Sequence, residues 1–289
     1  MYRCIKLTGS VCLAAAMGLA AAGITVMGAV SDRAEGKATE TEGTELPVIM
    51  YHGVTCDSGL AGEYTVTKKE LEGDIERLLA LGYTPVTCEE AADYVLRGGE
   101  LPQKPVVLSF DDGCFNNLMY VYPMLEKYDI KGVFAVTGKW TELAAAEEFP
   151  DPRYSYMDAD DIRTLVMSGR CEIAAHGYDM HVLGERRGML PKEGESDEDY
   201  RREVWGDLSA VKKLIAACGQ EEVTTLAYPY GFYEERTEEY SEQSGFEVTL
   251  SCEEGTNRLI RGDSGCLRCM KRYNRASGRD VISIISEQT

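Results

Sequence analysis

Short apolar runs alternate with amphipathic segments from Pro47 almost to the C-terminus. Apolar runs of about 4–8 residues between polar or turn residues are typical of buried strands. They predict strands at 47–51, 106–110, 132–137, 171–175, 224–228 and 246–251.

Helical periodicity and N-cap residues occupy the segments between these runs. Thr67 stands three residues before Glu70, which is the spacing of a capping box, and predicts a helix that continues to Leu81. Asp158 is a second N-cap, and further helices are predicted at 117–128, 200–218 and 234–244. Repeated strand–helix units predict an α/β fold whose parallel sheet closes into a barrel.

The N-terminal part of the chain lacks this alternation. Residues 1–30 carry Arg3 and Lys6 ahead of an uncharged, mostly apolar stretch at 7–30, which is the pattern of an export segment. Cleavage as a signal peptide and retention as a membrane anchor both fit its length. Residues 31–45 are polar and predict a flexible linker. One catalytic domain at 46–289 would then lie outside the cytoplasmic membrane, either secreted or anchored to its outer face.

The net charge of the chain limits the classes of partner that it is expected to bind. The 289 residues include 30 Lys plus Arg and 49 Asp plus Glu, which gives a formal net charge of −19. This sign argues against binding to nucleic acid phosphates or to an anionic membrane surface. A neutral or cationic partner is expected.

Side chains that bind metals follow two of the predicted strands directly. Asp111 and Asp112 come after the run at 106–110, and the segment after 171–175 begins with His176 and ends with His181. In a βα barrel, such loops gather at the C-terminal ends of the strands. Two imidazoles and one carboxylate leave open positions for water and substrate, as in a hydrolytic centre of zinc or another divalent first-row metal.

Taken singly, these residues have ordinary interpretations, with Asp-Asp-Gly as a turn and each histidine as a structural residue. The chain has only 3 histidines, however, and two of them fall in this one segment. On a helix, residues five apart would diverge by about 140°, so the pair is expected to converge from a loop. The combination therefore favours a site.

Three segments carry a resemblance to a known family. LSFDDG at 108–113, HGYDMH at 176–181 and AYPYG at 227–231 resemble the three signatures of the polysaccharide deacetylases, carbohydrate esterase family 4. The resemblance implies a distorted (β/α) barrel in a single domain. It also implies metal-dependent hydrolysis of the acetamide on an N-acetylated sugar.

The resemblance assigns a role to each site residue. Asp111 would be the general base that takes a proton from the metal-bound water, and the backbone N–H of Tyr230 would face the oxyanion. A divalent metal, zinc in the first instance and cobalt or nickel as alternatives, would be held by Asp112, His176 and His181.

This chain departs from the family pattern in spacing and in one arginine. Many members have histidines four residues apart, and an Arg where this chain has Ala227. Arg268 or Arg272 could supply the missing cation from the last strand. A solvated basic patch is the favoured interpretation of that segment.

The late histidine that serves many members as general acid is also missing. His52, which follows the strand at 47–51, is the remaining candidate. A Met-Tyr-His opening with five-residue histidine spacing resembles the branch with poly-β-1,6-N-acetylglucosamine deacetylases, in which this early histidine protonates the leaving amine. A hydrogen-bonded core histidine is the alternative.

Two further segments invite interpretation. Residues 185–200 are charged and contain Gly and Pro, which predicts a solvated surface loop, with a lid over the metal as the alternative. Cys266 and Cys269 form a single CxxC, which indicates a local or redox-labile pair rather than a zinc site.

The leading hypothesis is removal of N-acetyl groups from N-acetylglucosamine residues of a cell-surface polysaccharide, either an exopolysaccharide or peptidoglycan. A catalytically inactive carbohydrate-binding relative is the alternative, motivated by the missing Arg and late histidine. A peptide or small-amide hydrolase would use the same metal chemistry.

Overall fold

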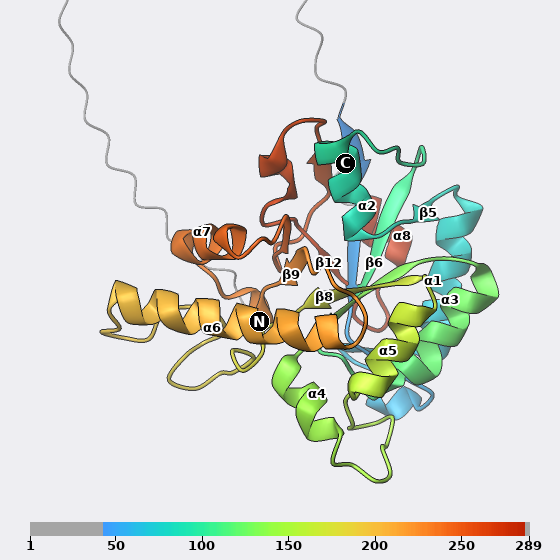
Figure 1. The fold of residues 1–289 in the computed structure, drawn as a ribbon. Helices are drawn as coiled ribbons and strands as arrows, with labels where there is room; N and C mark the ends of the chain where they lie inside the picture. Colours follow the sequence, from blue (N-terminus) through green and yellow to red (C-terminus); the bar gives the residue numbers. More distant parts are fainter. Residues whose placement is uncertain (1–42, 287–289) are drawn as a thin grey trace, which may run out of the picture.

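The structure, a computed structural model, describes residues 43–286 (Figure 1). Its main sheet is 8-stranded, with the path β10-β9-β8-β7-β6-β2-β12 and with β5 paired to β6, and every pairing is parallel. The strands are β2 (Val48–Tyr51), β5 (Thr84–Pro85), β6 (Pro105–Phe110), β7 (Gly132–Val136), β8 (Cys171–Ala175), β9 (Thr225–Ala227), β10 (Val248–Leu250) and β12 (Tyr273–Asn274).

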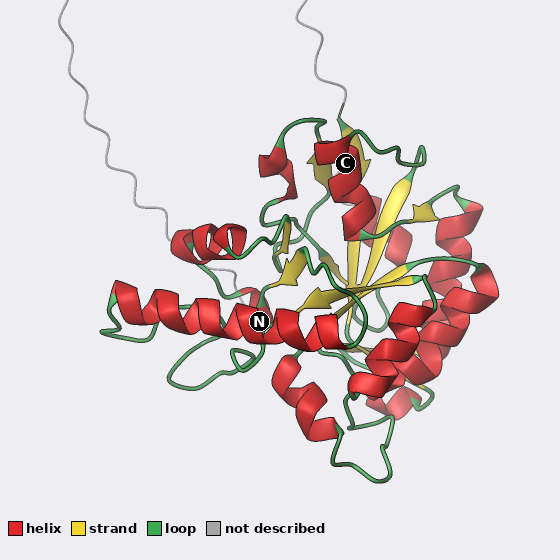
Figure 2. Ribbon diagram, viewed as in Figure 1, coloured by secondary structure: helices red, strands yellow, loops and turns green. Residues whose placement is uncertain are grey.

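The segment that leads into β12 joins the two edges of this sheet. Tyr273 pairs with Ile49 of β2 at one edge. At the other edge Met270 bridges to Leu250 of β10, and its N–H donates to the carbonyl of Thr249 at 2.7 Å. The predicted (β/α) barrel is therefore confirmed in its distorted form, with strands at the centre and helices outside (Figure 2).

Helices connect the strands, as the sequence predicted. Thr67 and Asp158 are N-caps, and each makes the capping box with the residue three positions later. The α-helices are α1 (Lys68–Ala80), α2 (Cys88–Ala92), α3 (Tyr122–Tyr128), α4 (Gly138–Ala144), α5 (Ala159–Met167), α6 (Asp197–Ala217), α7 (Glu235–Gln243) and α8 (Val281–Ser286). Among the described residues, no helix is long and apolar enough to cross a membrane.

Short elements complete the chain. Two small sheets pair β1 (Thr44–Leu46) with β11 (Asn257–Leu259) and β3 (Gly53–Thr55) with β4 (Thr65–Thr67). Strand β1 begins two residues before residue 46, at which the sequence predicted the catalytic domain to begin. Short 3₁₀ turns lie at Ser58–Leu60, Pro229–Gly231 and Ser264–Leu267, and π-helical turns at Asp93–Arg97 and Asn117–Val121. The predicted export segment and most of the linker lie outside the described residues.

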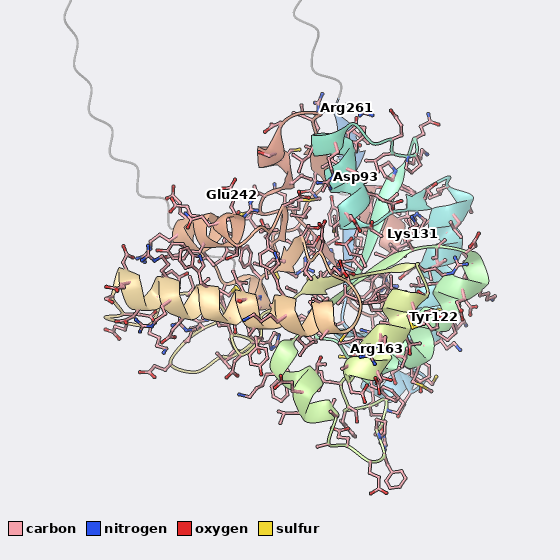
Figure 3. The ribbon with its side chains drawn as sticks, viewed as in Figure 1. Asp93, Tyr122, Lys131, Arg163, Glu242 and Arg261 are labelled. Carbon is pink, nitrogen blue, oxygen red and sulfur yellow. The ribbon has the colours of Figure 1, made fainter. Side chains whose placement is uncertain are left out.

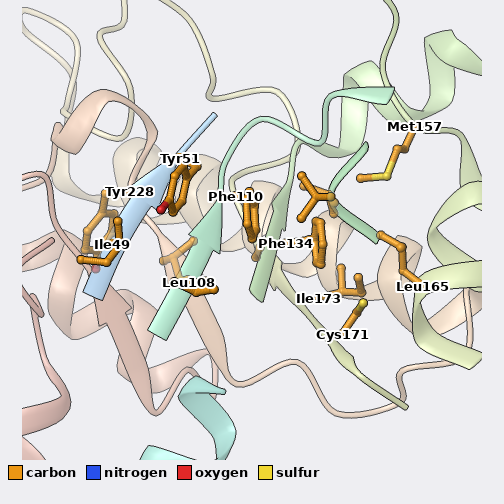
Figure 4. Packing of buried hydrophobic residues seen from close by; sticks show 14 of the residues in the cluster. Ile49, Tyr51, Leu108, Phe110, Phe134, Met157, Leu165, Cys171, Ile173 and Tyr228 are labelled. Carbon is orange, nitrogen blue, oxygen red and sulfur yellow. The ribbon is translucent and has the colours of Figure 1, made fainter. Parts of the chain in front are cut away.

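Strand residues alternate between two apolar layers. Side chains of one parity pack between the sheet and the helices, where the Phe110 ring lies between Tyr51 and Phe134 with centroids 5.2 Å away on each side (Figure 4). Side chains of the other parity fill the barrel and are smaller, such as Ala135 and Ala174. Burial on both faces explains why the strands read as continuous apolar runs. Most charged side chains lie at the periphery, as Figure 3 shows for Asp93, Lys131, Arg163, Glu242 and Arg261.

Candidate metal centre

The site residues continue the inward parity of the strands that precede them. Val107 lies in the interior layer, so Asp111, four residues later, has the same inward parity at the end of β6. Ala174, also in this layer, lies two residues before His176, which follows β8, and Val48 lies four residues before His52, which follows β2. The strands therefore aim these side chains into one end of the barrel. A cavity of about 470 Å³ opens there and is lined by Met50, His52, Glu63, Tyr64, Asp111, Asp112, His176, His181, Tyr230, Cys252, Glu254, Asn274 and Arg279.

The three predicted ligands meet in this cavity. Asp112 has a left-handed backbone with φ of 73°, followed by Gly113 at 72°, and this turn carries its carboxylate to the side of the barrel occupied by the histidines. Asp112 Oδ1 lies 3.4 Å from Nε2 of His176 and 3.1 Å from Nε2 of His181. One ligand atom from each residue falls within 4.8 Å of the other two.

Hydrogen bonds at Nδ1 fix the orientation of both histidine rings. Nδ1 of His176 lies 2.8 Å from the carbonyl oxygen of Ala227 and must donate to it. In a neutral ring Nε2 then carries the lone pair, and it faces the Asp112 carboxylate. Two acceptors so placed repel each other unless a proton or a metal cation lies between them, and with His181 beside them this donor set fits a divalent metal. His181 is held at Nδ1 by the Tyr230 hydroxyl at 3.1 Å.

Next to the donor set lies the carboxylate of Asp111, which pairs with an arginine. Asp111 is buried, and its Oδ1 accepts from Nη1 of Arg272 at 2.8 Å. Burial acts to raise the pKa of Asp111, but the charge of Arg272, followed by His176 and His52, outweighs it, so the pKa lies below its ordinary value. Within residues 43–286, Asp111 Oδ2 makes no hydrogen bond. This oxygen is therefore available in the cavity that Asp111 lines.

The interpretation of the last basic segment as a solvated patch is wrong. Arg272 is fully buried, and its Nε also donates to the carbonyl of Ser251 at 2.8 Å. Arg268 is mostly buried and pairs with Glu238 at 2.7 Å, away from the cavity. Met270, Arg272 and Asn274 alternate like strand residues facing the interior. That parity is the sequence signal that would have placed Arg272 in the barrel.

His52 lies in the same cavity. Its Nδ1 is buried and has no hydrogen-bond partner among the residues that the structure describes, unlike a satisfied core histidine. Its ring meets Tyr64 edge-on with centroids 5.0 Å apart. Burial lowers the pKa of His52, while the charges of Asp112 and Asp111 act in the opposite direction.

Tyr230 enters the cavity from a strained turn. Its backbone is left-handed, with φ of 58° and ψ of 8°, and Gly231 follows with φ of 67°. A Cβ at Gly231 would lie 2.8 Å from the Cβ of Cys252, so glycine is required there. The side chain of Tyr230 packs on the His181 ring with centroids 4.4 Å apart, a contact that the sequence did not predict.

The segment at 185–200 differs from its interpretation as a solvated loop. Residues 185–200 are not a wholly solvated loop, because Arg186 is buried and pairs with Glu195 and Glu203, and Tyr200 donates to the carbonyl of buried Met189 at 2.7 Å. Internal ion pairs thus hold this charged segment in place. All eight cysteines of the described part of the chain are free, including those of the CxxC.

Curated relatives share this region of sequence. The Bacillus subtilis protein YxkH, whose name describes a polysaccharide deacetylase, is 26% identical over 218 residues, which is 75% of this chain and 68% of YxkH. The poly-β-1,6-N-acetyl-D-glucosamine N-deacetylases of Escherichia coli K12 and Staphylococcus aureus MRSA252 are 23% and 25% identical over 75% and 66% of this chain. These matches cover 35% of the E. coli protein and 62% of the S. aureus protein.

Solved structures share the fold. A de-N-acetylase from Aggregatibacter actinomycetemcomitans has a TM-score of 0.71 at 24% identity, over 83% of this chain and 98% of that one. IcaB from Ammonifex degensii has a TM-score of 0.67 at 23% identity, over 84% of this chain and 95% of that one.

The family profile described as polysaccharide deacetylase matches residues 98–249. That range contains the Asp-Asp-Gly turn, both histidines of the donor set and the turn at Tyr230. It covers more than half of the chain, and the fold agrees with it. The chain therefore belongs to the polysaccharide deacetylase family.

Proposed function

We propose that this protein is a metal-dependent hydrolase that removes N-acetyl groups from N-acetylglucosamine residues of a cell-surface polysaccharide. The observation that carries the proposal is the donor set of Asp112, His176 and His181 directly beside the buried carboxylate of Asp111. Family membership and the names of the relatives support the class of substrate.

Each residue of the cavity then has a task. Asp112, His176 and His181 would hold a divalent cation, zinc in the first instance and cobalt or nickel as alternatives. When bound, such a cation acidifies water and polarises the acetamide carbonyl. Asp111 accepts the proton of the attacking water at its free Oδ2, and Arg272 keeps that carboxylate ionised and oriented.

Two more groups would act on the tetrahedral centre. The backbone N–H of Tyr230 stabilises its oxyanion, since the turn at Tyr230 lines the cavity. His52 gives a proton to the leaving amine. Because burial lowers its pKa, His52 must first take up a proton, and the charges of Asp112 and Asp111 favour that uptake.

The alternative of an inactive carbohydrate-binding relative has lost its main argument. It rested on the missing Arg and the missing late histidine of the family pattern. Arg272, just before β12, pairs with Asp111, and His52 lines the same cavity. We further propose that residues 1–30 direct export, as a signal peptide or membrane anchor, and that the domain acts outside the cytoplasmic membrane on exopolysaccharide or peptidoglycan.

Acetate release tests the proposal. The zinc-loaded protein is incubated with β-1,6-linked and β-1,4-linked N-acetylglucosamine oligomers, with peptidoglycan and with an N-acetylated peptide, before and after chelation. Release from a glycan that disappears on chelation and in Asp111→Asn is the expected result, and the preferred polymer identifies the substrate. Release from the peptide alone, or from none of them by a protein that holds one metal, would overturn it.

A further inference from the structure

A buried carboxylate on α6 holds the segment between the two histidines of the donor set. Asp207 is 8% exposed. Its Oδ1 accepts from the backbone N–H of Tyr178 at 2.8 Å, and its Oδ2 accepts from the N–H of Asp179 at 2.6 Å. Both carboxylate oxygens of Asp207 thus accept hydrogen bonds from the segment between His176 and His181, which we call the link.

The opposite side of this link is held by the start of α4, which lies next to α6 (Figure 1). The N–H groups of Gly138 and Lys139 donate to the carbonyls of Gly177 and Tyr178 at 3.0 and 2.8 Å. A Cβ at Gly138 would lie 2.4 Å from a ring carbon of Tyr178, so only glycine permits this approach. Acceptors from α6 thus bind the N–H groups of Tyr178 and Asp179, and donors from α4 bind the carbonyls of Gly177 and Tyr178.

The spacing of the histidines explains why such a clamp is needed. Five residues of helix would point the two rings apart, and an irregular link leaves buried N–H groups that need partners. Asp207 supplies two acceptors in fixed positions. Burial raises the pKa of Asp207 to about 6, with the backbone N–H groups acting against burial, so the clamp is ionised at neutral pH.

We propose that Asp207 is a positioning residue of the metal centre, which sets the place of His181 relative to His176 without touching the metal. The affinity for metal then depends on a carboxylate that is not a ligand. Loss of a group that orients a ligand typically weakens metal binding by about 10–100-fold. This inference rests on the metal-binding part of the proposed function and is independent of the substrate.

Metal titration of Asp207→Asn tests the inference. Asparagine has the same shape, but it presents an NH₂ group to one of the two backbone N–H donors. We expect Zn²⁺ and Co²⁺ to bind about 10–100-fold more weakly, in competition with a chelating dye, and the visible spectrum of bound Co²⁺ to change. Glu198→Gln removes the same charge from an exposed position of α6 and should leave both readouts unchanged. Wild-type affinity in Asp207→Asn would overturn the inference.

A double-mutant cycle separates positioning from general damage. If Asp207 acts through His181, then Asp207→Asn should weaken Co²⁺ binding far less in a His181→Ala background than in the wild type. Equal losses in both backgrounds would show that Asp207 acts only on the fold, and would refute positioning.

A second variant tests the same link if Asp207→Asn fails to fold. Gly138→Ala pushes the link from the α4 side and should also weaken Co²⁺ binding, while Gly206→Ala, which meets nothing within 4 Å, serves as its control. Unchanged binding in Gly138→Ala would count against the clamp. Because these readouts need no substrate, a protein that binds metal through the clamp but releases no acetate would refute the proposed function alone.

Discussion

Two buried arginines at the end of the barrel pair with two buried aspartates, and the pairs differ. Arg275 contacts both oxygens of Asp74 on α1, at 2.7 and 3.1 Å. Arg272 contacts only Oδ1 of Asp111, at 2.8 Å. One aspartate is fully engaged behind the sheet, and the other keeps an oxygen for the cavity.

The pKa values of the two carboxylates also differ, and they shift in opposite directions. Burial raises the pKa of Asp74 despite Arg275, and the Tyr51 hydroxyl adds a neutral donor at 3.1 Å. The pKa of Asp111 is lowered because His176 and His52 add to the charge of Arg272. The comparison teaches that an arginine–aspartate contact alone does not make a base, since the groups around the contact decide its acidity.

The largest effect should come from the carboxylate that faces the cavity. Asp111→Asn should lower turnover by about 10²–10⁴-fold, since general base catalysis contributes about that much. Steady-state acetate release measures it, with metal content determined in parallel. Asp74→Asn is the matched control, and its turnover per folded molecule should stay near that of the wild type. Equal losses in the two variants would erase the distinction between the pairs.

The pair behind the sheet should matter for stability instead. Arg275→Met leaves the Asp74 carboxylate buried without its cation, which should lower the free energy of unfolding by about 3–5 kcal/mol in urea titrations. The double variant Asp74→Leu with Arg275→Met should recover most of that loss, because it removes both charges. A double variant as unstable as the single one would contradict this account.

A third buried carboxylate has no arginine and extends the comparison. Glu172 accepts from the Thr225 hydroxyl at 2.5 Å and from the N–H of Glu89 at 3.0 Å, and burial raises its pKa to about 7. The folded state thus binds this proton more tightly than the unfolded state. The contribution of Glu172 to the free energy of unfolding should therefore fall, by about 3 kcal/mol, as pH rises from about 4.5 to about 7.

Glu172→Gln removes that dependence on pH. Urea unfolding of both proteins at pH 5 and pH 8 measures it, as the difference between the two pH responses. Relative to the wild type, the variant should have a higher free energy of unfolding at pH 8 than at pH 5. Parallel pH responses would mean that Glu172 is not the proton-binding group.

The smallest effect is expected from a substitution of Arg272 that keeps its positive charge but removes its planar guanidinium group. Arg272→Lys retains a cation beside Asp111 but cannot also reach the Ser251 carbonyl with the same planar group. Turnover should fall about tenfold, which corresponds to about 1.4 kcal/mol, with metal affinity unchanged. Arg268→Lys, in the pair with Glu238 outside the cavity, is the control. A loss as large as that of Asp111→Asn would show that the planar group itself is essential.

Local pattern predicted much of the fold and the donor set. The runs at 106–110 and 171–175 match β6 and β8 closely, because strands buried on both faces must be apolar throughout. The residues at their ends then follow from parity. Arg272 shares the parity of Met270 and Asn274, but its basic neighbours favoured solvent, and the partner that explains its burial lies 161 positions away.

The charged segment at 185–200 was mispredicted for a related reason. Its composition is that of a solvated loop, whereas the ion pairs of Arg186 with Glu195 and with Glu203 of α6 hold it in place. Asp207 likewise carries no signal in the sequence of an amphipathic helix. Groups that act through distant backbone are visible only once the fold is known.

The closure of the barrel by residues 270–274 has a consequence for the order of folding. Arg272 and Arg275 bind partners 161 and 201 positions earlier in the chain, so neither contact can form until the C-terminal segment has been synthesised. Contacts of such long separation form late, because their loop-closure entropy is large. A nascent or shortened chain would have its histidines and aspartates but no cation on Asp111, so the chemistry would begin only when the last strand is in place.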